Sequence, residues 1–175
     1  YLYKYPQTAF PYEELLIKNK LDRLSPEFEL ADTGIFDQHR YFDCLIEYAK
    51  AGINDILMKI TVINRGSEAA DIHVLPHLWY RNFWRHNQRF VKPVIKAQRP
   101  DYIHALSARN GSFFLYHEGG ETLFCDNETN TERIFHRPNE TLFVKDGINN
   151  HVVNGLATIN PERKGTKAAI HWTTR

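Results

Sequence analysis

Between Arg40 and Val62, apolar side chains recur at every second position, and this period limits the possible folds more than any other feature. It is typical of a β-strand that buries one face, because successive side chains of a strand point to opposite sides of the sheet. The alternating apolar residues are Phe42, Cys44, Ile46 and Tyr48, followed by Ile56, Met58, Ile60 and Val62. Turn-forming segments at 51–55 and 64–67 follow the two runs, and Ile72–Tyr80 supplies a third strand. The pattern predicts an antiparallel meander.

The rest of the chain favours the same class of fold. Nine Tyr, eleven Phe and three Trp give a high aromatic content, which favours strands. Further strands are predicted at Phe113–His117, Thr122–Cys125, Leu142–Val144 and Ala168–Trp172. Gly119 and Gly120 are predicted to form a tight hairpin between the first two of these. We therefore predict an all-β, antiparallel β-sandwich, formed as a single domain by residues 1–175.

One helix precedes the strands. Pro11 suits a first helical turn, and Glu13 and Glu14 suit the positive end of a helix dipole. Leucine and lysine residues continue the helix to Leu21, and Ser25 with Pro26 then interrupts it. The predicted sandwich thus has a short N-terminal helix.

Charge, cysteine content and hydropathy exclude several classes of protein. The net charge of +1 provides no overall field that would attract nucleic acid or a membrane surface. No apolar run approaches the roughly 18 residues that a membrane-spanning helix requires. Cys44 and Cys125 are too few for a disulfide framework, which favours a reducing compartment and predicts a cytoplasmic protein. The chain begins at Tyr1 rather than at methionine, as a fragment of a longer protein would.

Two segments of opposite charge are candidates for binding. Segment 81–100 contains six Arg or Lys residues, no acidic residue, and the aromatic residues Phe83, Trp84 and Phe90. Such a mixture fits a solvated loop, contact with sugars, or stacking of nucleic-acid bases. Segment 118–132 contains five acidic residues and no basic one, and it could pair with the basic segment.

Metal sites, cofactor sites and catalytic groups have little support. In segment 126–137 the positions that a calcium loop requires as Gly and Glu are Thr131 and Arg137. His73 and His77 are spaced for a helix but stand in a predicted strand, where they would be roughly 13 Å apart. Motifs for a serine nucleophile, a phosphate loop or a dinucleotide are absent from the sequence. We therefore predict no metal, no cofactor and no catalytic residue.

Four phrases resemble one known family. They are Tyr3-Lys4-Tyr5-Pro6-Gln7-Thr8-Ala9-Phe10-Pro11-Tyr12-Glu13, Leu78-Trp79-Tyr80-Arg81-Asn82-Phe83-Trp84, Asp126-Asn127-Glu128-Thr129-Asn130, and Asn160-Pro161-Glu162-Arg163-Lys164-Gly165-Thr166-Lys167-Ala168-Ala169. In this order they resemble the N-terminal region of bacterial glucosidases related to glycoside hydrolase family 63, including the mannosylglycerate-hydrolase-like group. The resemblance covers most of the chain.

The resemblance implies a β-sandwich (supersandwich-like) that accompanies a later (α/α)6 barrel holding the catalytic carboxylates. The chain would then be a non-catalytic domain of an α-glucosidase-like or α-mannosidase-like enzyme. Its partner would be the C-terminal barrel of the same polypeptide, whose cleft it would help to line. Residues expected to touch sugar, or to fix the interface with the barrel, are Trp79, Arg81, Asn82, Trp84, Glu128 and Asn130.

Two other functions remain open, together with one further kind of partner. A stand-alone carbohydrate-binding module would bind sugar without a catalytic domain. A nucleic-acid-binding domain would use segment 81–99, although the acidic segment and the small net charge argue against that function and against a nucleic-acid partner. Exposed strand edges would favour self-association.

Overall fold

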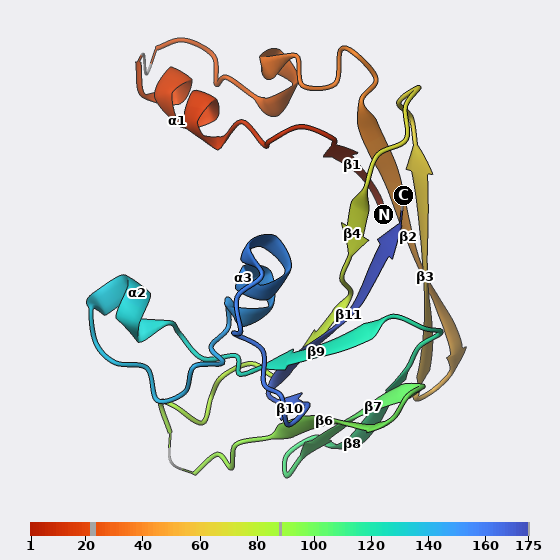
Figure 1. The fold of residues 1–175 in the computed structure, drawn as a ribbon, viewed down its shortest axis with the longest axis vertical. Helices are drawn as coiled ribbons and strands as arrows, with labels where there is room; N and C mark the ends of the chain where they lie inside the picture. The colour runs from red at the N-terminus through yellow and green to blue at the C-terminus, as the bar shows by residue number, and fades with distance from the viewer. Residues whose placement is uncertain (22–23, 88, 175) are drawn as a thin grey trace. The chain divides into compact units, whose positions relative to one another are not determined.

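The computed structural model describes residues 1–21, 24–87 and 89–174 (Figure 1). The fold is mostly β and contains three antiparallel sheets and few helices, as the sequence predicts. The chain divides into two compact units, residues 1–71 and residues 72–174, and each is described by itself.

The elements of the first unit are β1 (Leu2–Pro6), α1 (Tyr12–Leu21), a 3-10 turn η1 (Leu30–Thr33), β2 (Tyr41–Gly52) and β3 (Asp55–Asn64). Those of the second unit are β4 (Ile72–Val74), β5 (His77–Trp79), β6 (Val94–Arg99), β7 (Tyr102–Ser107), β8 (Gly111–Tyr116), β9 (Glu121–Cys125), α2 (Thr131–Phe135), α3 (Gly147–Asn154), β10 (Lys164–Gly165) and β11 (Lys167–Thr174).

The first unit is built on the predicted hairpin of β2 and β3, which pair in register from Phe42 opposite Asn64 to Lys50 opposite Ile56. β1, which the sequence pattern does not predict, adds to the other edge of β2. Asp43 lies buried in β2 and accepts hydrogen bonds from Lys4 Nζ at 2.7 Å and from Arg65 Nε at 2.6 Å. The helix α1 confirms the predicted N-terminal helix.

One face of the first unit's sheet is almost entirely apolar. Because directly opposed residues of a sheet point to the same side, the register places one set of side chains together. The set is Tyr1, Tyr3, Tyr5, Phe42, Cys44, Ile46, Tyr48, Ile56, Met58, Ile60 and Val62, with the polar Lys50 and Asn64 at its two ends. Several of its members stay exposed, including Tyr3, Tyr48, Ile56 and Met58. The alternation of the sequence thus marks an apolar face that this chain leaves open to solvent in part.

The second unit is a β-sandwich. One sheet has the strand order β10-β6-β7-β8, and in the other β11 pairs with β4 and β5 and also with β9. Ile95, Ile103 and Ala105 of the first sheet pack against Phe124 and Ile170 of the second, and all five are almost fully buried. These contacts form the core between the two sheets.

Where β9 pairs with β11, the second sheet of this unit is buried on both faces. Phe124 of β9 faces the other sheet, whereas the neighbouring Leu123 and Cys125 face α3, where Ile148 is 1% exposed. A strand covered on both sides must be apolar at consecutive positions. This explains why β9 and β11 lack the alternation of apolar and polar residues that marks β2 and β3.

Several predicted strands were wrong in detail. The segment Ile72–Tyr80 is interrupted at Leu75 and Pro76, and its two short strands pair with β11 instead of continuing the meander. Gly119 and Gly120 join β8 and β9, but these strands belong to different sheets and do not form a hairpin. Residues 142–144 form no strand, and Val94–Arg99, within the basic segment 81–100 where no strand was predicted, does.

Within the described part of the chain, no helix has the length and apolar character that crossing a membrane requires.

Candidate functional site

Three of the four family-like phrases converge at one end of the sandwich in the second unit. The chain leaves β10, passes through Thr166 and enters β11, so that it moves from one sheet to the other within three residues. Thr166 is fully buried; its amide donates to Asp126 Oδ1 at 3.1 Å, and its hydroxyl accepts from the Asn127 amide at 2.8 Å. The segment after β9 therefore supports the point where the chain changes sheets.

The segment after β5 is held at the same place. Asn127 Nδ2 donates to the carbonyl oxygen of Tyr80 at 2.9 Å, and Asn82 Nδ2 donates to the carbonyl oxygen of Asn127 at 3.0 Å. The Tyr80 amide donates to the carbonyl oxygen of Thr166 at 3.0 Å. These hydrogen bonds connect segments separated by about forty residues or more in the sequence. We call this group the junction cluster: Asn82, Trp84, Lys92, Asp126, Asn127, Glu128 and Thr166.

Glu128 is the most enclosed charged group of the junction cluster, with 7% of the residue exposed. Its Oε1 accepts from Trp84 Nε1 at 3.1 Å and from Lys92 Nζ at 2.9 Å, and its Oε2 lies 3.4 Å from Arg85 Nη1. Lys92 also donates to Asp126 Oδ2 at 2.9 Å, and Arg85 forms a second ion pair with Glu140. The predicted pairing of the acidic and basic segments is confirmed at these contacts.

The environment keeps Glu128 ionised. Burial raises the pKa of this carboxyl group, but the hydrogen bonds from Lys92 and Trp84 and the charge of Arg85 outweigh it. The pKa of Glu128 is therefore below its ordinary value. A general acid in glycoside hydrolysis requires a raised pKa. Glu128 thus has the electrostatics of an ion-pair partner and not of a proton donor at neutral pH.

The six residues singled out in the sequence lie in different surroundings. Asn82, Trp84 and Glu128 meet in the junction cluster, as described above. Trp79 lies on β5 and is 57% exposed, and the guanidinium carbon of Arg81 lies 5.0 Å from the centre of the Phe83 ring. Of the six, these two present the most surface for a ligand or a neighbouring domain.

Asn130, the sixth, is used within the fold. Its Oδ1 accepts from the Arg133 amide at 3.0 Å and caps the N-terminus of α2, while its Nδ2 donates to Asp146. Asn139 Nδ2 donates to the same Oδ1 at 2.9 Å. These bonds tie α2 to the segment that precedes α3.

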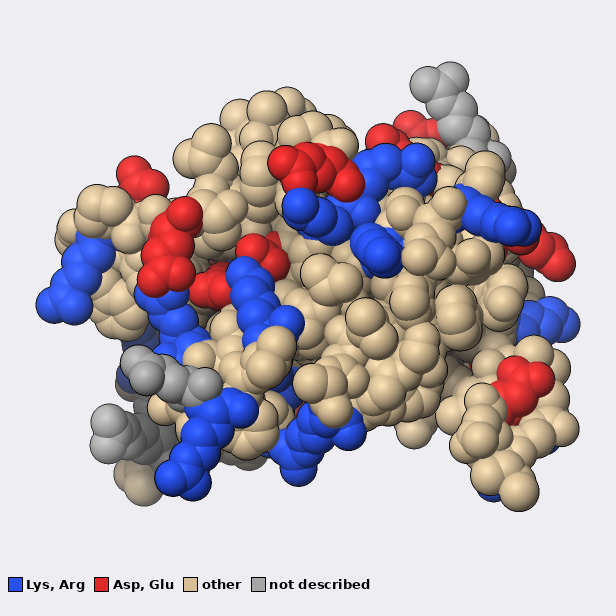
Figure 2. Space-filling model, turned by 90° about the horizontal axis from the view of Figure 1, so that it is seen from below, with Lys and Arg blue, Asp and Glu red and all other residues tan. Residues whose placement is uncertain are grey.

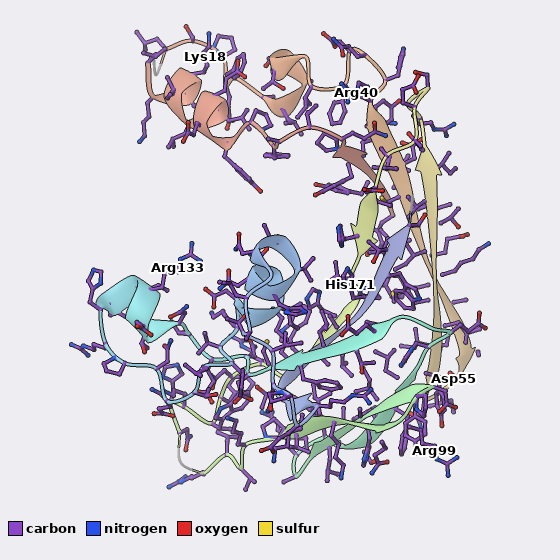
Figure 3. The ribbon with its side chains drawn as sticks, viewed as in Figure 1. Lys18, Arg40, Asp55, Arg99, Arg133 and His171 are labelled. Carbon is purple, nitrogen blue, oxygen red and sulfur yellow. The ribbon has the colours of Figure 1, made fainter. Side chains whose placement is uncertain are left out.

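A groove of about 570 Å³ lies at another part of the second unit, near the end of β6. The residues that line it include Gln98, Arg99, Glu121, Asn160 and Arg163. Arg163 has a φ of 52°, which is an uncommon backbone conformation for a residue other than glycine. Its Nη2 donates to Thr122 Oγ1 at 2.7 Å. Arg99 is labelled in Figure 3. The groove offers hydrogen-bond donors and acceptors, but none of its described lining residues is aromatic.

Histidines of two strands form a pair outside the junction cluster and the groove. His73 of β4 and His171 of β11, the latter labelled in Figure 3, stack with their rings 5.0 Å apart, and His73 Nδ1 lies 2.8 Å from His171 Nε2. Burial lowers the pKa of His171, and the charge of His73 lowers it further. Among residues 1–21, 24–87 and 89–174, no group of three or more His, Cys, Asp or Glu side chains is arranged to hold a metal ion.

Comparison with protein-family models, curated protein sequences and solved structures gives no significant match.

Four members of the junction cluster are not among the six residues selected from the sequence: Lys92, Asp126, Asn127 and Thr166. Asn127 and Thr166 stand inside two of the family-like phrases, but nothing in their local pattern shows that they face each other. Lys92 lies in the basic segment, and its importance comes from contacts with Asp126 and Glu128, which are more than thirty residues away. Only the sheet topology brings these side chains together.

Proposed function

We propose that this chain is a non-catalytic β-sandwich domain of a glycoside hydrolase resembling family 63. Its role would be to pack against an (α/α)6 catalytic barrel elsewhere in the same polypeptide and to line one side of the barrel's cleft. The reaction of the whole enzyme would be hydrolysis of an α-glucosidic or α-mannosidic bond.

The observation that carries this proposal is the hydrogen-bonded convergence of three family-like phrases in the junction cluster. In the sequence these three phrases are separate segments, and only their order along the chain links them to one another as features of the same family. In the structure their polar side chains satisfy one another, which is the relation expected of residues that define a common architecture. This supports membership of a structural family more directly than it supports any chemistry of the cluster itself.

A second observation supports a large partner. The apolar face of the β1-β2-β3 sheet leaves large side chains open to solvent: Tyr1 is 87% exposed, Tyr48 60% and Ile56 71%. Surfaces of this kind mark interfaces between proteins or domains.

A second candidate function is carbohydrate binding by the second unit alone, and the groove favours it. A volume of about 570 Å³ is in the range of small-molecule sites. Arg99 and Glu121 supply charged groups, and Gln98 supplies an amide, which suits a ligand with many hydroxyl groups. Sugars are commonly held by stacking on aromatic rings, and the described lining of the groove has none. The accessory-domain proposal is therefore preferred to carbohydrate binding by this unit alone.

Nucleic-acid binding receives less support. On the face seen in Figure 2, basic and acidic side chains lie next to one another. Lys92 and Arg85 of the basic segment form ion pairs with acidic residues, so they do not present free charge to phosphates.

The test is turnover of a panel of α-linked gluco- and manno-disaccharides and glycosylglycerates. The panel is given both to residues 1–175 and to the full-length product of the natural gene, and binding of each sugar to residues 1–175 is measured by calorimetry. Hydrolysis by the full-length product alone is the expected result. Hydrolysis by residues 1–175, or a full-length product that lacks a barrel and hydrolyses nothing, contradicts the proposal. Sugar affinity without hydrolysis in either protein would favour the carbohydrate-binding function.

A further inference from the structure

The edge strand β8 of the second unit lacks the features that protect a sheet edge from pairing. Natural edges are commonly protected by charged residues, proline, a bulge or short length. β8 has the sequence Gly-Ser-Phe-Phe-Leu-Tyr, without a charge or a proline, and it pairs with β7 over six consecutive residues without a bulge. Its outer edge is not paired with any described strand. β8 is therefore a template for another strand.

Three other sheet edges are better protected. At the opposite side of the same sheet, β10 has only two residues, one of which is Lys164. In the first unit, β1 contains Lys4 and Pro6, and β3 contains Asp55 and Lys59. Of these four edge strands, β8 is the one that has neither a charged residue, nor a proline, nor a short length.

The side chains of β8 add apolar surface on both faces of the sheet. Phe113 is 53% exposed, Phe114 is 50% exposed and Tyr116 is 68% exposed. On the face that points away from the sandwich core, Phe114 stacks on His104 with ring centroids 4.8 Å apart, and Tyr116 lies 5.4 Å from Tyr102. Tyr116 and Phe114 stand directly opposite these β7 residues in the register. An aromatic cluster therefore reaches the open edge.

We propose that β8 pairs antiparallel with β8 of a second copy of this chain and joins the two four-stranded sheets into one. A two-fold axis perpendicular to the sheet relates β8 of one copy to β8 of the other, and it places residues of the same sheet face opposite one another. Phe114 of one copy then lies opposite Phe114 of the other, and Phe113 lies opposite Leu115. The aromatic clusters become continuous across the axis, and the uncharged strands meet without repulsion.

The area places the dimer interface in a size class. An aromatic side chain offers about 200 Å², so the exposed parts of Phe113, Phe114 and Tyr116 amount to roughly 700 Å² over two copies. The backbone edges bring the buried surface to about 1,000 Å², which is near the lower limit for a specific interface. The dimer is accordingly weak and forms as the protein concentration rises. The self-association that exposed edges favour is thereby assigned to one strand.

The test is sedimentation equilibrium of the 175-residue chain over a range from micromolar to about one millimolar, compared with Phe114→Lys and Met58→Lys. Met58 is an exposed residue of the other long edge strand, β3, and serves as the matched control. Phe114→Lys sets two ammonium groups opposite each other and removes a ring pair, which should weaken dimerisation by about tenfold or more. Met58→Lys should dimerise as the unchanged chain does.

Three results would overturn the proposal. The unchanged chain could stay monomeric at every concentration, or the Phe114→Lys variant could dimerise as strongly as the unchanged chain. The third is loss of the dimer in Met58→Lys alone. If Phe114→Lys loses the circular-dichroism spectrum of the folded chain, Tyr116→Lys replaces it, because Tyr116 is the most exposed of the three rings. A Phe114→Cys variant should also give a disulfide-linked dimer on oxidation, since residues on the two-fold axis approach closely enough.

Discussion

Replacing Glu128 by glutamine tests whether the charge of this residue, rather than its shape, stabilises the second unit. Glutamine keeps the side-chain size and one carbonyl oxygen for Trp84, but it removes the negative charge that faces Lys92 and Arg85. Hydrogen bonds to a charged group contribute about 1.5–3 kcal/mol each when buried. Lys92 and Arg85 are partly exposed and keep other carboxylate partners, so solvent reduces the loss. We expect Glu128→Gln to lower the free energy of unfolding by about 1.5–2 kcal/mol at neutral pH.

Glu140→Gln is the matched control. Glu140 pairs with the same Arg85, but its side chain is 68% exposed, so its loss should cost about 0.5 kcal/mol or less. The assay is urea unfolding followed by tryptophan fluorescence. All three tryptophans, at positions 79, 84 and 172, lie in the second unit, so the signal reports this unit alone.

The pH dependence gives the decisive result. Because the pKa of Glu128 is lowered in the folded chain, the unfolded chain binds more protons between the two pKa values. The stabilisation by this carboxylate is therefore complete above the unfolded pKa and is lost as the pH falls through the folded pKa. The unchanged chain and Glu128→Gln should converge in stability on acidification. Equal losses in the glutamine variants at 128 and 140, or a difference that does not change with pH, would refute the reasoning.

Three further outcomes are expected. Gly165→Ala should destabilise the second unit by about 2–3 kcal/mol in the same urea unfolding, because a Cβ there would overlap the carbonyl oxygen of Cys125; an unchanged unfolding midpoint would contradict this close approach. Because the pKa of His171 is lowered in the folded chain, the free energy of unfolding should fall as the pH drops below the unfolded histidine value of about 6.5. His171→Asn should make this dependence of stability on pH less steep in the same assay, and an unchanged dependence would contradict the assignment. Burial raises the pKa of Cys125 to about 11, so an alkylating reagent followed by mass spectrometry should label Cys44 first and Cys125 only after unfolding; early labelling of Cys125 would be inconsistent with its burial.

How much the sequence could predict differs between the two units. The hairpin of β2 and β3 was predictable, since one of its faces is apolar at every second residue and the two strands follow each other in the chain. β6 and β7 were missed, because they carry few of the alternating signals, and β6 lies within the basic segment 81–100 while β7 directly follows it. Which strands pair was not predictable for β4 and β5, whose partner residues in β11 lie about one hundred and about ninety residues away, respectively.

The candidate site shows the same limit. Trp84 and Glu128 were selected for their chemistry and prove to be hydrogen-bonded to each other. Their partner Lys92 was not selected, since its role depends on the long-range pairing that places β9 and β10 near the segment after β5. Periodicity predicts which face of a strand is buried, but it does not specify which distant loops meet at the end of a sandwich.

β11 has a consequence for how the second unit folds. It pairs with β4, β5 and β9, all of which precede it in the chain, and it is joined to β10 of the other sheet by Thr166 alone. Loop closure over such long separations must be completed before any of these pairings contributes stability, so folding should be slow for a unit of this size. During synthesis, β4, β5 and β9 have no partner in their sheet until β11 leaves the ribosome. The second unit should therefore acquire its structure late and in one cooperative step.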